Sequence, residues 1–487
     1  MITSFNDLLP LLPLLIVTAT SVVAMLMIGI RRSYIATGAI TITGLLVATL
    51  VAVSMMGWTS QQVTPLLIID QYSLLFTVVV CASAMVLAVL SFPYFFELDD
   101  QKEEYFLLLT IATVGAIVMV SSNHFVSTVL GLETLSMSLY GMIAYPLHSA
   151  KSAKFPLEAS VKYLVLSAAA SGFILFGMAL IYAQTGTLSF ASVTKLPASG
   201  LGDGYTVVAL LMVVSGMAFK LSLAPFHMWT PDVYEGAPLP ATAYLATIGK
   251  AAMFVVLLRF MLISDALSFD SMVAVLTLIA ATSMVVGNLL ALLQDNLKRI
   301  LAYSSIAHMG YLLLALVAGH YVTGTIAVEA ITFYLIAYMI MSLGAFGVAS
   351  IISSSEKEFD SIKEYRGLFW RSPLLATTFI AMLLSLAGIP LTVGFIGKFY
   401  IFLSGVEAGL WMLLGVLVLG SGIGLYYYLR IIYRMFMPEK QSLPYRVGGV
   451  ESVGSYAVLA ILLFLLLLFG IYPEPIMLIV ATASALI

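Results

Sequence analysis

Charged side chains are scarce in this chain. Of its 487 residues, 9% are charged and 62% are hydrophobic, whereas a soluble globular protein has roughly 25% charged residues. The chain therefore has too little polar surface to cover itself in water. Its net charge of −3 also excludes the strongly basic surface that attracts nucleic acid.

Cysteine is nearly absent as well. Cys81, the only one, stands in an apolar run, which excludes disulfides, cysteine-ligated iron–sulfur clusters and thiolate zinc sites within this chain. We interpret Cys81 as a small apolar core residue. The five histidines lack the paired spacing of a bis-histidine haem site, and no glycine-rich nucleotide motif lies outside the apolar runs. We expect no redox chemistry, metal or cofactor in this chain.

Long apolar runs are what the sequence does contain. Runs of about 20 residues predict helices, because the strands of membrane barrels have about 10 alternating residues. Helices satisfy their own backbone hydrogen bonds in lipid, so we predict an all-α polytopic membrane protein. Residues 1–10 lack the features of a signal peptide, and the first run is expected to be a retained span. About fourteen spans can be placed, at residues 8–30, 35–57, 66–92, 105–121, 124–146, 157–184, 205–230, 240–263, 271–293, 299–318, 322–352, 372–403, 408–437 and 453–482.

Basic residues predict the orientation of these spans, because Lys and Arg accumulate in cytoplasmic loops. One set of alternate loops has only Lys195 and, near a span end, Arg259. Both chain ends belong to that set, so they are expected to face the periplasm of a bacterial inner (plasma) membrane. The opposite set contains Arg31, Arg32, Lys102, Lys151, Lys154, Lys298, Arg299, Lys357, Lys363, Arg366, Arg371, Arg430, Arg434, Lys440 and Arg446.

Four lysines remain inside the predicted spans: Lys162, Lys220, Lys250 and Lys398. A charge at the centre of a membrane helix costs about 2.5 kcal/mol or more, which makes such residues functional candidates. Desolvation also disfavours the charged form of a buried lysine, as a reversible proton carrier requires. Snorkelling from a span end is the alternative, and it applies best to Lys162.

Two of these lysines stand beside matching helix breaks. The sequence Leu-Ser-Leu-Ala at 221–224 precedes a proline, and it occurs again at 384–387 before Gly-Ile-Pro. Interrupted helices in two halves of a transporter indicate its transport site. Proline frees a helical carbonyl, so we expect such a carbonyl to hold the Lys220 ammonium. His227 follows in the same interrupted segment.

Glu133 is the one acidic residue central in a strongly apolar span, and we expect it to be buried. A glutamate and a lysine about 10 Å apart attract each other by roughly 1.7 kcal/mol at an effective dielectric constant near 20. A movement of Glu133 would therefore change the proton affinity of Lys220. A hydrogen bond that serves only helix packing is the alternative.

Two further sites are weaker candidates. Glu158 and Lys162 are four residues apart in the orientation that favours a helical ion pair. Such a pair could serve the structure alone or take part in proton transfer. His308 follows the hydroxyl groups of residues 303–305, an arrangement suited to a proton relay or to a hydrogen-bonded packing histidine.

Two motifs carry a family resemblance. Residues 219–238, FKLSLAPFHMWTPDVYEGAP, resemble the signature of antiporter-like subunits found in respiratory complex I and in multisubunit cation/proton antiporters. Residues 388–400, GIPLTVGFIGKFY, are similar to NADH:quinone oxidoreductase subunit N, whose relatives often have glutamate at the position of Lys398. The chain ends soon after its last span and lacks the long lateral helix of the largest antiporter-like subunit, which also favours subunit N.

The resemblance implies fourteen helices with two inverted five-helix repeats that contain broken helices. The implied segments are a three-helix part (1–104), a first repeat (105–265), a second repeat (266–437) and a loop with the last helix (438–487). The implied partners are the lipid bilayer and other membrane subunits of complex I, including neighbouring antiporter-like subunits. The assembly would carry FMN and iron–sulfur clusters in other subunits, and would use NADH and quinone, such as ubiquinone.

The expected activity is that of a translocase subunit: quinone reduction elsewhere shifts Glu133, and protons pass through Lys220, Lys250 and His308 to Lys398. Glu158, Lys162 and His227 complete the candidate site. The alternative is a subunit of a multisubunit Na⁺/H⁺ antiporter, which is disfavoured because Na⁺ prefers oxygen ligands to a row of lysines.

Overall fold

The structure of this chain is a computed structural model, and it describes residues 5–96, 98, 101–145, 154–191, 193, 203–322, 324–355, 358–438 and 453–485. In this part of the chain, eleven helical segments are long and apolar enough to cross a membrane, and four shorter apolar helices accompany them. The prediction of an all-α polytopic membrane protein is therefore confirmed.

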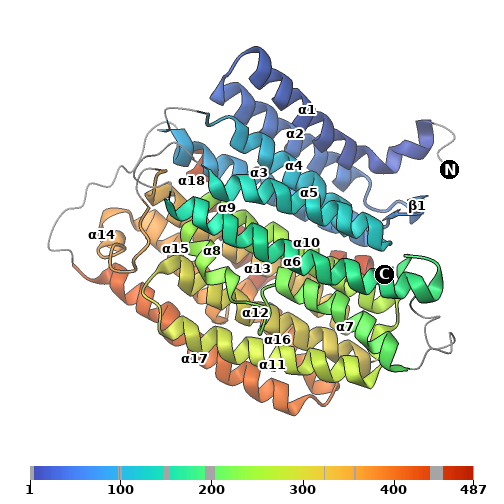
Figure 1. The fold of residues 1–487 in the computed structure, drawn as a ribbon. Coiled ribbons are helices and arrows are strands. Elements are labelled where there is room, and N and C mark those ends of the chain that lie inside the picture. Colours follow the sequence, from blue (N-terminus) through green and yellow to red (C-terminus); the bar gives the residue numbers. More distant parts are fainter. Residues whose placement is uncertain are drawn as a thin grey trace.

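The N-terminal elements form one edge of the bundle. Figure 1 shows α1 and α2 as a hairpin at the edge of the molecule and the short strands β1 and β2 near one end of it. The elements in this part are η1 (Phe5–Leu11), α1 (Leu12–Ile30), α2 (Tyr34–Ser54), β1 (Gln61–Thr64), β2 (Leu67–Ile69), α3 (Gln71–Phe96), α4 (Glu104–Val120), α5 (Phe125–Ala144), α6 (Lys154–Thr185) and α7 (Asp203–Lys220).

The middle of the chain supplies the most buried helices, α12 and α13. A single span at Leu239–Ile263 contains α9, a π-helical turn and α10. The elements here are α8 (Trp229–Gly236), α9 (Leu239–Tyr244), the π turn η3 (Leu245–Gly249), α10 (Lys250–Ile263), η4 (Ala266–Ser268), α11 (Asp270–Leu292), α12 (Leu297–Tyr321) and α13 (Ile326–Ile352).

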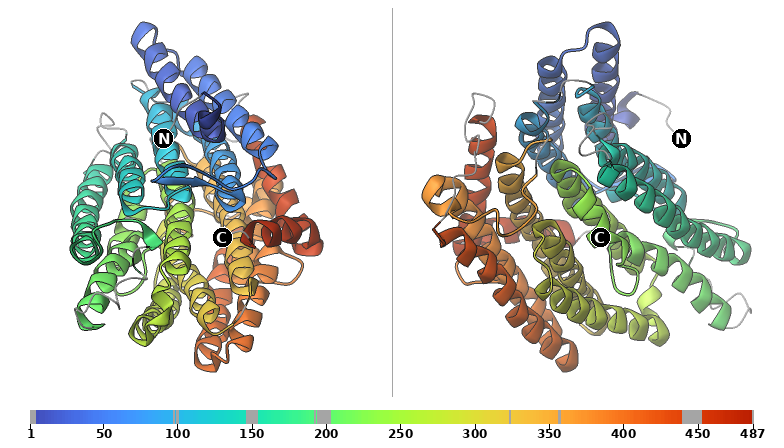
Figure 2. Two further views of the ribbon diagram at one scale, coloured as in Figure 1. Left: turned by 90° about the vertical axis from the view of Figure 1, so that its right-hand side faces the viewer. Right: turned by 60° about the vertical axis from the view of Figure 1, so that its left-hand side comes forward.

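The C-terminal elements pack on the other side of this centre, where α13 contacts α15, α16, α18 and α19 as well as α3 and α12. In the right-hand view of Figure 2, the orange and red C-terminal helices lie on the left, and the blue and teal N-terminal helices lie at the top and right. The last elements are α14 (Leu368–Arg371), α15 (Pro373–Ala387), α16 (Val393–Glu407), α17 (Trp411–Phe436), α18 (Val453–Ile471) and α19 (Glu474–Ser484).

Helices occupy every predicted apolar run, but three of the runs are divided. The run at 205–230 is interrupted between α7 and α8, the run at 372–403 between α15 and α16, and the run at 453–482 between α18 and α19. The first two interruptions fall at the repeated Leu-Ser-Leu-Ala sequence. Most of the predicted loop 438–453 lies outside the described residues, as do Lys151, Lys195, Lys357, Lys440 and Arg446, together with the side chain of Lys154.

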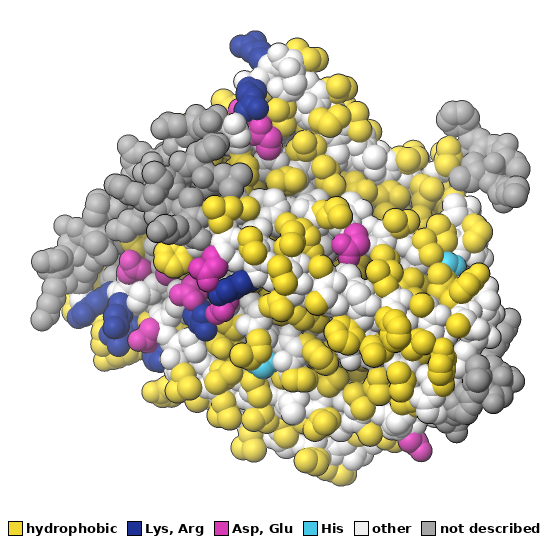
Figure 3. Space-filling view, viewed as in Figure 1, with side chains coloured by type: hydrophobic (Ala, Val, Ile, Leu, Met, Phe, Trp, Pro, Cys, Tyr) yellow, Lys and Arg dark blue, Asp and Glu magenta, His cyan; other side chains and the backbone are white. Residues whose placement is uncertain are grey.

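Charge is distributed very unevenly over the molecule. On the face drawn in Figure 3, apolar side chains cover most of the surface and charged side chains gather towards its left side. Two basic residues that the sequence assigned to loops are instead buried, Arg259 at 2% exposed and Lys298 at 1%. Burial therefore extends to cations near span ends, which turn inward to carboxylates that are distant in the sequence.

Candidate functional site

The break between α7 and α8 places Lys220 at the end of α7. The chain leaves helical geometry here, with Ser222 at a φ of 62°. Neighbouring groups satisfy part of the freed backbone: Ala224 N donates to Ser283 Oγ (2.8 Å), and Trp229 Nε1 donates to Phe219 O (3.0 Å).

Hydroxyl groups from two other helices hold the Lys220 ammonium. Its Nζ donates to Ser136 Oγ of α5 (3.0 Å) and to Ser167 Oγ of α6, and it lies 5.9 Å from the ring centroid of Tyr163. Lys220 is 7% exposed. The prediction that a freed carbonyl holds Lys220 was therefore wrong, because the contacts of its Nζ are serine hydroxyls.

Glu133, on α5, is only half-buried, not enclosed as the sequence suggested. Ser171 Oγ donates to its Oε1 (2.6 Å). Ser171 and Ser167 are four residues apart and therefore share one face of α6, so this helix contacts both the carboxylate and the ammonium. The negative charge of Glu133 attracts the ammonium group of Lys220.

Lys250 follows the π turn η3, a kind of helix defect that is frequent at functional sites. It is 1% exposed, and its Nζ donates to Ser305 Oγ of α12 (2.7 Å). Tyr338 OH donates to the same oxygen (2.7 Å), and the Tyr234 ring centroid lies 5.6 Å from Nζ. No carboxylate pairs with Lys250 among the described residues.

His308 is three residues after Ser305 and therefore on the same face of α12. Its Nδ1 contacts Tyr334 OH (2.5 Å) and its Nε2 contacts Tyr428 OH (3.4 Å). Tyr428 OH also shares a hydrogen bond with Ser304. Since a hydroxyl group both donates and accepts, this geometry fits either tautomer of His308.

The break between α15 and α16 builds a carbonyl cradle for Lys398. Nζ donates to Leu386 O (3.0 Å) and Ala387 O (2.9 Å), two carbonyls near the end of α15. Gly388 has a φ of 90°, and a Cβ there would lie 2.9 Å from Cδ of Lys398, so glycine provides both the turn and the space. The arrangement expected at Lys220 thus occurs at Lys398.

Tyr311 connects His308 to Lys398. Its ring centroid is 5.6 Å from the His308 ring and 5.3 Å from Lys398 Nζ. Tyr338 links Ser305 to His308, because its hydroxyl donates to Ser305 Oγ and its ring centroid lies 5.4 Å from the His308 ring. Lys250, Ser305, His308, Tyr311 and Lys398 therefore form a connected series across α12, which we call the central row.

Lys162 lies apart from the central row, in a charge cluster of α6, α8 and α12. Its Nζ pairs with Glu158 (2.8 Å) and Asp232 (3.3 Å), and its side chain is 43% exposed. Arg299 Nη1 pairs with Asp232 (2.9 Å) and Glu235 (2.8 Å). Burial alone would raise the pKa of Asp232, but hydrogen bonds from Arg299 and Lys162 outweigh it and hold that pKa below its usual range. The helical ion pair expected at Glu158 and Lys162 is present.

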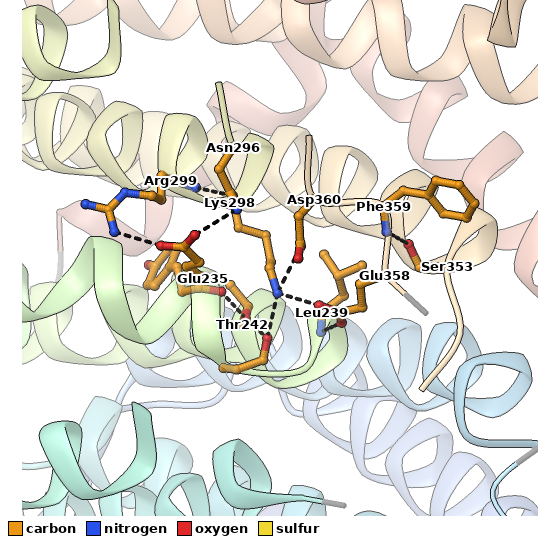
Figure 4. A network of polar contacts seen from close by, with 12 residues as sticks. Glu235, Leu239, Thr242, Asn296, Lys298, Arg299, Ser353, Glu358, Phe359 and Asp360 are labelled. Carbon is orange, nitrogen blue, oxygen red and sulfur yellow. Dashed lines mark hydrogen bonds and ion pairs between the residues drawn. The ribbon is translucent and has the colours of Figure 1, made fainter. Parts of the chain in front are cut away.

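A second ionic network lies next to this cluster (Figure 4). Lys298 Nζ pairs with Glu358 and with Asp360 (3.3 Å) and donates to Ala237 O (3.1 Å). Glu358 Oε1 accepts a hydrogen bond from Leu239 N (2.8 Å). The loop before α14 is thereby fastened to the start of α9 and to the start of α12.

His227 and two neighbours in the α7–α8 break are buried polar residues. Within the described residues, Ser222 Oγ, His227 Nδ1 and Thr230 Oγ1 have no hydrogen-bond partner, and all three residues are at most 7% exposed. Such groups are normally satisfied by internal water.

Sequence reasoning missed the serines that hold Glu133 and Lys220. Spacing could have indicated them, because Ser136 follows Glu133 by three residues and Ser167 and Ser171 are four apart. It could not have shown that the two helices face Lys220. Within the described residues, no group of three or more His, Cys, Asp or Glu side chains is placed to hold a metal ion.

Residues 122–424 match the family described as NADH:quinone oxidoreductase/Mrp antiporter, transmembrane. A curated relative, NADH-quinone oxidoreductase subunit N of Ectopseudomonas mendocina (strain ymp), is 46% identical over 98% of this chain and 97% of that protein.

Three solved complexes contain chains that are similar to this one. One is in respiratory complex I from Thermus thermophilus with bound aureothin, at 32% identity and a TM-score of 0.82, covering 97% of this chain and 100% of that one. Another is in the archaeal membrane-bound sulfane sulfur reductase, at 25% identity and a TM-score of 0.85, covering 99% and 98% of the two chains. A chain of the Mrp complex from Dietzia sp. DQ12-45-1b has a TM-score of 0.86 at 21% identity over 99% and 97%, a likeness of fold alone.

Proposed function

The chain belongs to the NADH:quinone oxidoreductase/Mrp antiporter transmembrane family, and from this membership we propose that its buried lysines carry protons across the membrane. It is a proton-translocating membrane subunit of complex I, in agreement with its 46% identical relative, which is named NADH-quinone oxidoreductase subunit N, and with the similar chain in respiratory complex I. The FMN and iron–sulfur clusters belong to other subunits, where NADH is oxidised and quinone is reduced. Other membrane subunits of the complex, including antiporter-like ones, are its partners.

The central row is the observation that carries the proton route. It leads from Lys250 through the hydroxyl of Ser305 and the imidazole of His308 to Tyr311 and Lys398. The lysines at its two ends are hydrogen-bonded to neutral oxygen atoms, so no fixed anion among the described residues holds their protons. A carrier of this kind can lose and regain a proton within one cycle.

Proton uptake is assigned to the α7–α8 break. The unpartnered groups of Ser222, His227 and Thr230 are suited to hold internal water beside Lys220. The next helix, α8, contributes Asp232 and Glu235 to the charge cluster, and the Asp232 side chain is 43% exposed. We place the mouth of the uptake path there, with His227 between the cluster and Lys220.

Several sites must act in sequence for this route to work. Moving one charge against the membrane potential requires about 2.3 kcal/mol per ~100 mV, whereas one Glu–Lys attraction at about 10 Å supplies roughly 1.7 kcal/mol. Glu133 is the proposed input, because it acts on Lys220 through α6 and is half-exposed on the surface of α5.

Neutralising Glu133 tests that input. Glu133→Gln is expected to lower proton pumping several-fold, and Glu133→Asp to retain more of it, because only the aspartate keeps a charge that acts on Lys220. Pumping is measured per assembled complex against inhibitor-sensitive NADH oxidation. Ser171→Ala is the matched control, since it removes the hydrogen bond to Glu133 but leaves the charge. Equal pumping by Glu133→Gln and the native protein would contradict the assignment.

The fourteen-span topology, the inverted repeats and the segment boundaries 1–104, 105–265, 266–437 and 438–487 are part of the proposal, with both termini in the periplasm of the bacterial inner membrane. The unequal distribution of basic loop residues supports this orientation.

Cysteine labelling tests the orientation. In a Cys81→Ala background, a cysteine at the exposed Gln61 is expected to react with an impermeant maleimide only from outside, and a cysteine at the exposed Lys363 only from the cytoplasmic side. Right-side-out and inside-out vesicles provide the two comparisons. Labelling of both positions from the same side would overturn the topology.

A Na⁺/H⁺ antiporter activity is not proposed. Ammonium groups at both ends of the central row repel a cation, and hard cations prefer oxygen ligands. Sodium flux in proteoliposomes with the isolated chain would be the contrary result.

A further inference from the structure

A buried ion pair at the far end of α10 takes no part in the proton route described above. Arg259 Nη1 donates to Asp70 Oδ2 (2.8 Å) and Nη2 donates to Asp70 Oδ1 (3.0 Å). The two side chains are 2% and 3% exposed. Ser73 N also donates to Asp70 Oδ1 (2.8 Å), and the Tyr72 ring centroid lies 6.0 Å from the guanidinium carbon. A strongly held arginine is therefore fixed between α3 and α10.

Arg259 lies on the same helix as Lys250, towards the end of the Leu239–Ile263 span that is remote from the ionic network of Figure 4. Leu239, at the start of the Leu239–Ile263 span, contacts Glu358 of that network. Arg259 is twenty residues further on (259 − 239), or about 30 Å along a helix. Lys250 is between them, about 13.5 Å from Arg259 by the same measure.

The stretch of α10 between Lys250 and Arg259 is apolar. Its eight residues are Ala, Ala, Met, Phe, Val, Val, Leu and Leu, and all of them are buried. The unpartnered polar groups of Ser222, His227 and Thr230, by contrast, belong to the α7–α8 break and to α8, not to this stretch. Between Lys250 and Arg259, α10 therefore offers water no polar side chain.

We propose that Arg259, positioned by Asp70, is an electrostatic seal: its fixed charge prevents protons from leaving Lys250 along α10 towards Arg259. The inference rests on the proposed function, because it concerns the proton carried by Lys250 and identifies a direction in which that proton does not leave. A guanidinium remains protonated at every physiological pH, and an arginine in a narrow path raises an electrostatic barrier to protons. The apolar stretch and the fixed charge together direct a proton from Lys250 sideways along the central row to Lys398.

The two members of the pair have different tasks, which makes the seal testable. Asp70→Asn keeps the guanidinium, whereas Asp70→Asn combined with Arg259→Gln removes the charge and leaves two polar amides. In the assembled complex in proteoliposomes, the double variant is expected to dissipate an imposed pH gradient several-fold faster than the native complex, without NADH present. Asp70→Asn alone is expected to hold the gradient.

A pair that only braces the fold predicts the reverse order. Removing one partner leaves an unpaired buried charge and is more damaging than removing both, so Asp70→Asn would then be the worse variant. The matched control is Lys298→Gln combined with Glu358→Gln, which neutralises a buried pair at the other end of the span and is expected to hold the gradient.

Three results would overturn the seal: a tight membrane with the double variant, an equal leak from the control, or failure of the double variant to assemble, which would make the pair a folding element. The proposed function is judged separately, because it depends on NADH-driven pumping by Lys220 variants and not on passive leak.

Discussion

Replacing Lys220 with methionine is expected to abolish most NADH-driven proton pumping while the complex still assembles. Methionine has a similar length and no charge, so it fills the buried site without adding volume. It cannot bind a proton beside the α7–α8 break. The hydroxyls of Ser136 and Ser167 lose their ammonium partner, but Ser167 Oγ still accepts a hydrogen bond from Tyr140 OH (2.8 Å). One unsatisfied hydroxyl costs about 1–3 kcal/mol, which a large bundle tolerates.

The measurement is proton uptake or release per assembled complex, compared with inhibitor-sensitive NADH oxidation. Ser136→Ala combined with Ser167→Ala is the matched control, because it removes the hydrogen bonds and keeps the ammonium. We expect this control to pump less than the native complex but clearly more than Lys220→Met. Native pumping by an assembled Lys220→Met complex would reject Lys220 as a proton carrier.

The fold was predictable because its signal is local. Runs of about 20 apolar residues leave few structures open in lipid, and each run contains a helix. Both functional breaks were predictable from short motifs, since a proline or Gly-Ile-Pro directly after each Leu-Ser-Leu-Ala sequence disfavours a continuous helix. Each of these features depends on residues that are close in the sequence.

The partners of the lysines were not predictable in the same way. A carbonyl cradle was expected at Lys220, but it occurs at Lys398. At the second break Gly388 reaches a φ of 90° and leaves the carbonyls of Leu386 and Ala387 free for the lysine. At the first break, by contrast, hydroxyls from α5 and α6 reach the ammonium. Which groups reach a lysine depends on the packing of separate helices, and the motif does not contain that information.

Buried cations at span ends were missed for a related reason. Counting basic residues treats those near a span end as exposed. Arg259 is buried because Asp70, nearly 190 residues earlier, lies opposite it, and Lys298 is buried because Glu358 and Asp360 return to it from a later loop. A carboxylate that is distant in the sequence decides each case.

Substitutions at Lys398 are expected to separate a titratable exit from a packing residue. We expect Lys398→Glu to pump more than Lys398→Ala, and Lys398→Arg to pump poorly. The carbonyls of Leu386 and Ala387 accept hydrogen bonds from the native ammonium. A glutamic acid can donate its proton to one of them, whereas its carboxylate would face two acceptors and lose solvation. Glutamate at this position therefore still binds and releases a proton.

Alanine at residue 398 removes the group altogether, and arginine retains a charge that it does not release during the cycle. The larger arginine side chain must also fit beside Gly388, where a Cβ would already lie 2.9 Å from Cδ of Lys398. Pumping is compared per assembled complex and normalised to inhibitor-sensitive NADH oxidation, so that lost coupling is distinguished from lost enzyme. If Lys398→Ala and Lys398→Arg both pump normally, Lys398 serves packing alone. The proton would then have to leave the central row nearer His308 or Lys250, where hydroxyl groups of Ser305, Tyr334 and Tyr428 offer the next acceptors.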